Sequence, residues 1–189
     1  MSKVRSVGEE VWKHKTDKIN SELLTLTYGS IVAQLVADFD HDYAKVNKQL
    51  DKMGYNIGLR LIEELLAKTG LPRCQNFRDT AEAVAKVGFK MFMNITPTIS
   101  NWSVDSKQFS LVFTENPLAE FVELPDKPNA RDLWYSNIYA GVIRGALEMV
   151  QLQVEAEFVS DAVQDPSLPT EIRVRLVKVL EDEIPPGED

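Results

Sequence analysis

The single cysteine, Cys74, offers the most chemistry in this chain of 189 residues. It stands between two helical patterns, in the sequence Leu-Pro-Arg-Cys-Gln, and a thiolate there would be a nucleophile for acyl groups. Arg73 beside it and the start of a helix after it would both stabilise the thiolate. A buried, unmodified cysteine is the commoner case. Cys74 is therefore either an acylation site or an ordinary core thiol.

Small residues occupy helical positions where large apolar side chains would be expected. The helix after Cys74 carries Ala81, Ala85 and Gly88, and two further helices carry glycine pairs, Gly54 with Gly58 and Gly141 with Gly145. Glycine inside a helix costs about 1 kcal/mol relative to alanine, so these positions need a compensating reason. Close contact between helices is one reason. A tunnel that an apolar ligand fills is the other, and the residues themselves leave both open.

Signatures of the common enzyme classes are missing from the sequence. The only histidines, His14 and His41, lie in an N-terminal arm and a loop, with no second ligand at metal spacing. There is no phosphate-binding loop, no nucleophile elbow and no H-E-x-x-H motif. A Cys/His catalytic pair would require the fold to bring a histidine to Cys74, and nothing in the pattern orders one. We expect no catalytic residues, no metal site and no diffusible cofactor.

Composition and charge exclude several other classes. Apolar residues make up 44% of the chain, too many for an intrinsically disordered protein. The net charge of −8 disfavours binding to nucleic acid. No apolar run approaches the roughly 20 residues that span a bilayer, and the N-terminus lacks the apolar segment of a signal peptide. A lone cysteine fits a reducing compartment, so we expect a cytoplasmic protein or one on a cytosolic membrane face.

The periodicity predicts four main helices followed by strands. Helical stripes run from about 21 to 39, 46 to 69, 76 to 92 and 135 to 150, and Asn20 or Ser21 would cap the first. Residues 98–102 and 109–113 read as a hairpin. Apolar and polar residues alternate along 152–158 and 171–180, as in strands with one buried face. The solvent-facing positions are acidic on the first strand and basic on the second, which favours antiparallel pairing of the two. The fold class is α+β, a single layered domain with helices on one face of a short, mainly antiparallel sheet.

Six stretches of the sequence carry a family resemblance. They are residues 24–29 (LTLTYG), 46–54 (VNKQLDKMG), 95–102 (ITPTISNW), 116–118 (NPL), 121–125 (FVELP) and 144–150 (RGALEMV). With these runs the chain resembles the Bet-three family, the third small core subunit of the transport protein particle (TRAPP) vesicle-tethering complex. The match runs in register from about residue 21 to 188. The arm at residues 1–20 and the loop at 126–132 lie outside it.

The resemblance implies a cysteine that carries a thioester-linked fatty acyl chain, normally palmitoyl, and Cys74 matches that position. It also implies that the chain lies in an internal apolar tunnel, where Gly88 takes the place of a small residue. The residues that we expect to line this tunnel are Phe77, Ala81, Val84, Ala85 and Gly88. A buried chain of this size could contribute on the order of 10 kcal/mol in transfer terms, so it would serve as core rather than as a membrane anchor.

Function and partners also follow from the resemblance. It implies a non-catalytic subunit that forms a homodimer through its helical face, joins other small TRAPP subunits and supports vesicle tethering between endoplasmic reticulum and Golgi. The complex would promote nucleotide exchange on a Rab/Ypt-class GTPase and associate peripherally with the cytosolic face of the cis-Golgi and endoplasmic reticulum. The acidic tail residues Glu181, Asp182, Glu183 and Glu188 are expected to contact the GTPase.

The expected organisation is a flexible arm at 1–20, the family domain at 21–181 and an acidic tail at 182–189. Two other functions remain open. One is a lipid-carrier or lipid-sensing domain that binds free fatty acid, and the other is a thiol enzyme that passes acyl groups onward.

Overall fold

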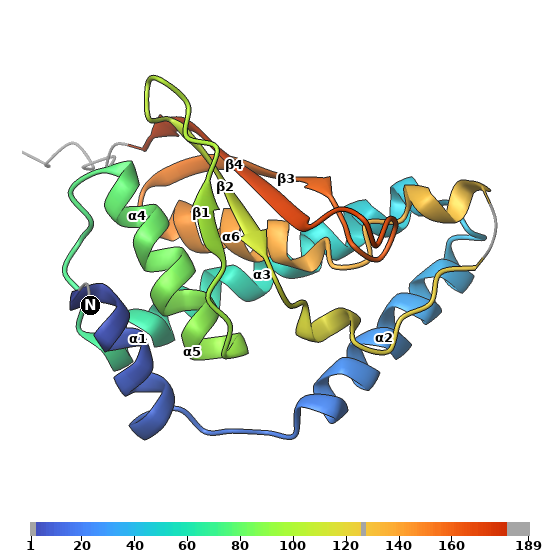
Figure 1. The fold of residues 1–189 in the computed structure, drawn as a ribbon, viewed down its shortest axis with the longest axis horizontal. Helices are drawn as coiled ribbons and strands as arrows, with labels where there is room; N and C mark the ends of the chain where they lie inside the picture. The colour runs from blue at the N-terminus through green and yellow to red at the C-terminus, as the bar shows by residue number, and fades with distance from the viewer. Residues whose placement is uncertain (1–2, 126–127, 181–189) are drawn as a thin grey trace, which may run out of the picture.

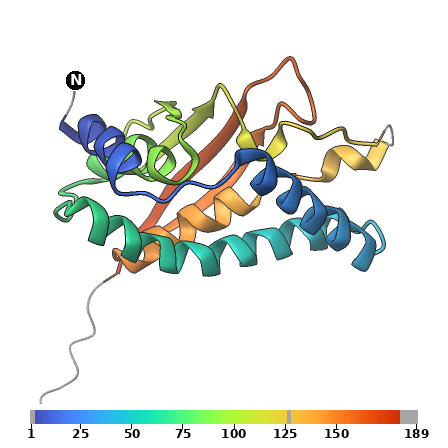
Figure 2. The same cartoon turned by 90° about the horizontal axis from the view of Figure 1, so that it is seen from below.

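The computed structural model describes residues 3–125 and 128–180. In chain order the elements are α1 (Lys3–His14), α2 (Ser21–Asp38), α3 (Tyr43–Thr69), α4 (Phe77–Ala83), the π-helical turn η1 (Val84–Gly88), α5 (Phe89–Met93), β1 (Thr98–Ser100), β2 (Gln108–Phe113), the 3₁₀ turns η2 (Pro117–Ala119) and η3 (Pro128–Asp132), α6 (Ile138–Met149), β3 (Leu152–Ser160) and β4 (Thr170–Val179). Together they form one α+β domain, with the helices against one face of a sheet (Figures 1 and 2).

The sheet has four antiparallel strands in the order β1-β2-β4-β3. The predicted hairpin is confirmed, since Thr98 pairs with Val112 and Ser100 with Ser110. The last two strands also pair as predicted, and β4 lies between β2 and β3. Side chains on the inner face of the sheet are buried in the core, as at Phe109, Ile172 and Val174.

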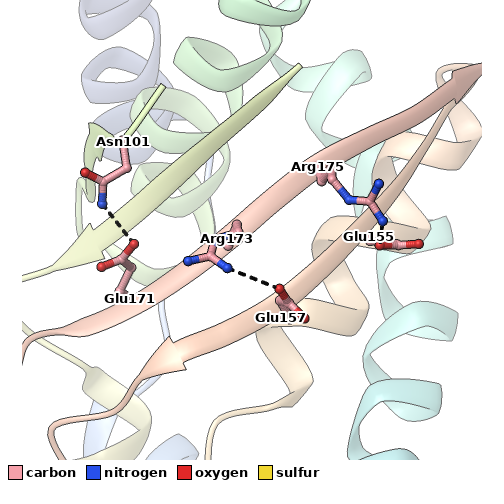
Figure 3. Close-up of polar contacts among 6 residues, drawn as sticks. All are labelled: Asn101, Glu155, Glu157, Glu171, Arg173 and Arg175. Atoms are coloured by element: carbon pink, nitrogen blue, oxygen red, sulfur yellow. Dashed lines mark hydrogen bonds and ion pairs between the residues drawn. The ribbon is translucent and has the colours of Figure 1, made fainter. Parts of the chain in front are cut away.

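The outer face of the sheet carries the charges that the alternating pattern predicted. Figure 3 shows Arg173 paired with Glu157 and Arg175 with Glu155 across β3 and β4. The Arg173 Nη1 to Glu157 Oε1 distance is 3.5 Å. These pairs are substantially exposed, so each contributes about 1 kcal/mol at most, and their main effect is to oppose slippage of the strand register.

Side-chain caps begin α2 and α4, and an αL glycine ends α3. The Asn20 side chain accepts a 2.9 Å hydrogen bond from the backbone N–H of Leu23 at the start of α2, as the sequence predicted. Asn76 accepts a hydrogen bond of the same length from the Asp79 N–H at the start of α4. Gly70, with φ of +61°, ends α3 in the left-handed conformation. The cap at Asn76 places the start of α4, at Phe77, three residues after Cys74.

The N-terminal segment differs from the expected loose arm, because residues Lys3–His14 form helix α1. Val4, Gly8 and Val11 share one face, and Val11 is 1% exposed. A Cβ on Gly8 would overlap the carbonyl oxygen of Lys86, so only glycine lets α1 approach η1 this closely. Helix α1 packs against η1 and α5 and also contacts α3. Its stability comes from this tertiary contact, which local periodicity does not reveal.

The third expected helix, from about 76 to 92, is interrupted. It begins as α4, passes through the π turn η1 and continues as α5. A π turn adds a residue to one turn of a helix and displaces the side chains that follow. Figure 1 shows this segment beside α1, at the end of the molecule opposite α2.

Helices α3 and α6 are in backbone contact, and four glycines make this contact. A Cβ at Gly54 or Gly58 would overlap a carbonyl oxygen of α6. A Cβ at Gly141 or Gly145 would overlap a carbonyl oxygen of α3. At these four positions close helix contact is therefore the reason for glycine. The two helices run side by side under the sheet (Figure 2).

Candidate functional site

A large apolar pocket lies between α3 and α6 on one side and α4–η1–α5 on the other. Its volume is about 1030 Å³, just above the range of roughly 300–1,000 Å³ for small-molecule sites. Aliphatic side chains of α3, including Ile57, Leu61 and Leu65, form one wall. Leu24 and Tyr28 of α2 contribute at one end, and the segment around Cys74 contributes at the other. The pocket can hold a long, narrow apolar ligand.

Cys74 lies on the link between α3 and α4, at the rim of this pocket. The residue as a whole is exposed. Its sulfur is nevertheless partly withdrawn from water, and this burial raises the pKa of the thiol. A hydrogen bond from the Thr80 hydroxyl opposes the increase in the pKa, and the negative charge of Asp79 adds to it.

The expectation of a stabilised thiolate is therefore wrong. The guanidinium of Arg73 donates a hydrogen bond to the side-chain oxygen of Gln151, and it is not among the groups that shift the pKa of Cys74. The loss of hydration at the sulfur outweighs the hydrogen bond from Thr80, which lowers the pKa. Cys74 is thus a neutral thiol at physiological pH, placed where a group attached to it can enter the pocket.

Of the five residues expected to line a tunnel, the structure places three in the wall of the pocket. Phe77, Val84 and Gly88 line it, together with Thr80, at spacings of three and four along the helix. Ala81 and Ala85 do not line it and are 0% exposed in the core. Each lies one position after a lining residue, which is about 100° around the helix axis at 3.6 residues per turn. Their small size serves core packing on an adjacent face of the helix.

Gly88 differs from the four glycines of the α3–α6 contact. A Cβ built on Gly88 would lie 3.7 Å from Cδ1 of Leu65 and 3.9 Å from the carbonyl oxygen of Ala83, both ordinary contact distances. The position therefore has room for a side chain, and the room belongs to the pocket. At Gly88 the absence of a side chain keeps volume open rather than bringing two backbones together.

Sequence reasoning missed several residues of the pocket. Thr80, which hydrogen-bonds to the Cys74 sulfur, gave no signal because a buried threonine is common in helices. Leu24, Tyr28 and Leu65 were on the predicted apolar stripes of their helices, but periodicity does not separate a side chain that lines a cavity from one that fills the core.

Other expected features can be placed only in part. The tail residues Glu181, Asp182, Glu183 and Glu188 lie outside the described residues. Within residues 3–125 and 128–180, no group of three or more His, Cys, Asp or Glu side chains is arranged to hold a metal ion. Over the same ranges no helix has the length and hydropathy needed to cross a bilayer.

The comparison with known families decides the relationship of this chain. The profile of the family described as "Transport protein particle (TRAPP) component" matches residues 24–175. The chain belongs to the TRAPP component family. Its relatives include the "Trafficking protein particle complex subunit BET3" of Saccharomyces cerevisiae, 58% identical over 98% of this chain and 95% of the relative. The "Transport protein particle subunit bet3" of Schizosaccharomyces pombe is also 58% identical, over 100% of both chains.

A solved structure of a TRAPP relative bears directly on the pocket. The crystal structure of a trafficking protein particle complex subunit 3 from Naegleria fowleri matches with a TM-score of 0.82 and 51% identity, over 88% of this chain and 100% of that one. That protein is covalently bound to palmitic acid. Together the comparisons make this chain a TRAPP complex subunit, with other TRAPP subunits as partners.

Proposed function

We propose that Cys74 of this TRAPP subunit carries a thioester-linked palmitoyl or similar fatty acyl chain, which lies in the pocket between α3, α6 and α4–η1–α5. The observation that carries the proposal is the position of the only cysteine at the rim of a 1030 Å³ apolar pocket. The palmitic acid bound covalently to the Naegleria relative supports it. The tunnel expected from the sequence is this pocket when the chain fills it.

The attachment reaction needs an activated acyl donor, and an acyl-coenzyme A thioester is the appropriate class. The Cys74 sulfur, after losing its proton, attacks the carbonyl carbon of the donor. A new carbon–sulfur bond forms, the bond to the coenzyme A sulfur breaks, and the departing thiolate takes up a proton. Because burial raises the pKa of Cys74, attack is slow, and a thioester once formed is partly withdrawn from water.

A carrier of free fatty acid is the competing function, and the raised pKa of Cys74 favours it because a neutral thiol is a poor nucleophile. A thiol enzyme is less well supported, since none of the described residues that line the pocket is a histidine or another side chain suited to act as a general base for Cys74.

Intact-mass analysis of the purified chain, before and after hydroxylamine, separates these functions. A thioester gives an added fatty acyl mass that hydroxylamine removes and that Cys74→Ser lacks. Acyl mass lost under denaturing conditions alone, and equal in Cys74→Ser, would instead identify a carrier. Single-turnover transfer of the acyl group from Cys74 to an acceptor would identify an enzyme.

We also propose that the outer face of α2 is the dimerisation surface of this chain. Ile19, Leu23 and Leu26 are 69%, 61% and 58% exposed on one side of this helix or just before it. Subunits of a complex bury such surfaces against one another, and a twofold dimer places the same patch on both partners. The occupant in the purified chain is a second copy. Leu23→Asp with Leu26→Asp should give a monomer in sedimentation, whereas Leu168→Asp, at an exposed loop leucine, should not.

In the assembled complex, this subunit supports vesicle tethering between endoplasmic reticulum and Golgi and nucleotide exchange on a Rab/Ypt-class GTPase. Its acidic tail, residues 182–189 with Glu181, would act at the nucleotide site, because carboxylates there compete with phosphate. Deletion of 181–189 should slow the nucleotide release from the GTPase that the intact complex promotes.

Membrane recruitment is proposed to come from partner subunits. With a net charge of −8, the isolated subunit should not float with anionic liposomes, and strong flotation would contradict this proposal.

A further inference from the structure

The pocket has two distinct ends, and their positions follow from α6. The carboxyl end of α6 lies beside Cys74, because Gln151 accepts the hydrogen bond from Arg73. The amino end lies beside Tyr28, whose hydroxyl donates to the carbonyl oxygen of Tyr135, three residues before α6 begins. Lining residues run along α6 from Ile138 to Met149, which is about 16 Å at 1.5 Å per residue. Tyr28 therefore stands at the far end of the pocket from Cys74.

Tyr28 is fixed in place. It is 5% exposed, its hydroxyl hydrogen bond to the Tyr135 carbonyl is 2.5 Å long, and its ring meets the Tyr135 ring edge to face at 5.3 Å. The neighbouring Gly29 lies against the Tyr135 hydroxyl, where a Cβ would be 3.2 Å from that oxygen. A ring held by a buried hydrogen bond and by an aromatic neighbour does not turn aside at low cost.

The region behind Tyr28 is unsuitable for a hydrocarbon chain. The peptide carbonyl and the phenol of Tyr135 lie there. The charge of Asp161, a residue that is 1% exposed, is close enough to act on the Tyr28 phenol. Polar groups that have already given up water gain nothing from contact with methylene groups. By contrast, the side walls are made of aliphatic residues such as Leu61 and Leu65, which can adjust their rotamers to the width of a ligand.

We propose that the ring of Tyr28 is the end stop of the pocket and sets the longest acyl chain that Cys74 retains fully buried. This inference rests on the proposed acylation and names the residue that selects the chain length. Chains shorter than the pocket are buried completely. Because the carbonyl carbon is fixed at the Cys74 sulfur, a chain longer than the pocket has to bend out near the rim and expose methylene groups, so longer donors lose in competition.

The test is a competition among myristoyl-, palmitoyl-, stearoyl- and arachidoyl-coenzyme A at equal concentration, with the full chain and intact-mass readout of the adducts. Tyr28→Leu should shift the distribution to longer chains than wild type by at least one donor in the series. Leu24→Phe enlarges a lining residue at the same end without touching the hydrogen bond, and it should shift the distribution to shorter chains. Because Leu24→Phe keeps Tyr28, it keeps the test decisive if Tyr28→Leu fails to fold.

A control variant separates the end stop from pocket size in general. Leu65→Ala enlarges the pocket at a side wall and should keep the wild-type cut-off. A wild-type distribution in both Tyr28→Leu and Leu24→Phe would overturn the end stop. So would a shift in Leu65→Ala as large as that in Tyr28→Leu. An absence of hydroxylamine-sensitive adduct on wild type would instead refute the proposed acylation.

Discussion

Replacing Gly88 with leucine tests whether the pocket is filled by an acyl chain. The new side chain would start from a helical backbone position with ordinary contacts, 3.7 Å from Leu65 Cδ1, and extend into the pocket. Without an acyl chain the variant should be as stable as wild type or more so. Leucine is a better helix former than glycine by about 1 kcal/mol, and its side chain fills empty apolar volume.

The acylated form should behave in the opposite way. The leucine side chain has four carbons, and if each displaces one methylene group from burial, the loss is about 0.8 kcal/mol per group and about 3 kcal/mol in total. For a chain of this size, 1 kcal/mol corresponds to roughly 2–4 °C in melting temperature. The increase in melting temperature that acylation gives should therefore fall by about 6–12 °C in Gly88→Leu.

Scanning calorimetry of acylated and hydroxylamine-treated protein measures both effects. Gly58→Leu is a matched control, because its Cβ would overlap the Val142 carbonyl oxygen in the α3–α6 contact. It should destabilise both forms equally, by about 1–3 kcal/mol or more. If Gly88→Leu shifts the melting of the acylated and free forms by equal amounts, the acyl chain does not occupy the space beside Gly88 and the proposed burial is refuted.

Three further predictions follow from individual residues. Because burial raises the pKa of Cys74, acyl transfer from acyl-coenzyme A should accelerate about tenfold per pH unit from pH 7 to pH 9, and a rate that is flat over this range would contradict the shift. Burial likewise raises the pKa of Asp161, so its stabilising effect is present at low pH and is lost as pH rises through the folded-state pKa. Asp161→Asn should therefore melt higher than wild type at pH 8 but not at pH 4, and an equal difference at both pH values would exclude this cause. Gly8→Val places a side chain on the Lys86 carbonyl and should detach α1, measured as faster tryptic cleavage within residues 3–18 while the melting of the remaining domain changes little.

The sequence predicts those parts of the fold in which neighbours along the chain carry the information. Alternating acidic and basic residues on two strands predicted their pairing, and Glu155 with Arg175 and Glu157 with Arg173 confirm it. The cap at Asn20 follows in the same way from local hydrogen-bonding chemistry. The α+β class follows from the order of these elements.

Tertiary contact decides what the sequence does not predict. The helical state of residues 3–14 depends on the contact of Gly8 and Val11 with a partner more than 70 residues away. The pKa of Cys74 depends on how much water the folded chain leaves at the sulfur, which a nearby arginine in the sequence does not reveal. Ala81 and Ala85 show the limit for the site, because the pattern of small residues gave the right helix but not which of its faces meets the pocket.

The backbone contact between α3 and α6 has a mechanical consequence. Because α3 and α6 touch backbone to backbone through their glycines, they move as one rigid unit, and this wall of the pocket cannot widen easily. Any widening during entry of a hydrocarbon tail must come from the opposite side, where η1 interrupts the regular helix and α1 braces it from outside. Helix α1 would then resist outward movement of the α4–η1–α5 wall. Removal of α1 should therefore speed loading of the protein with lipid.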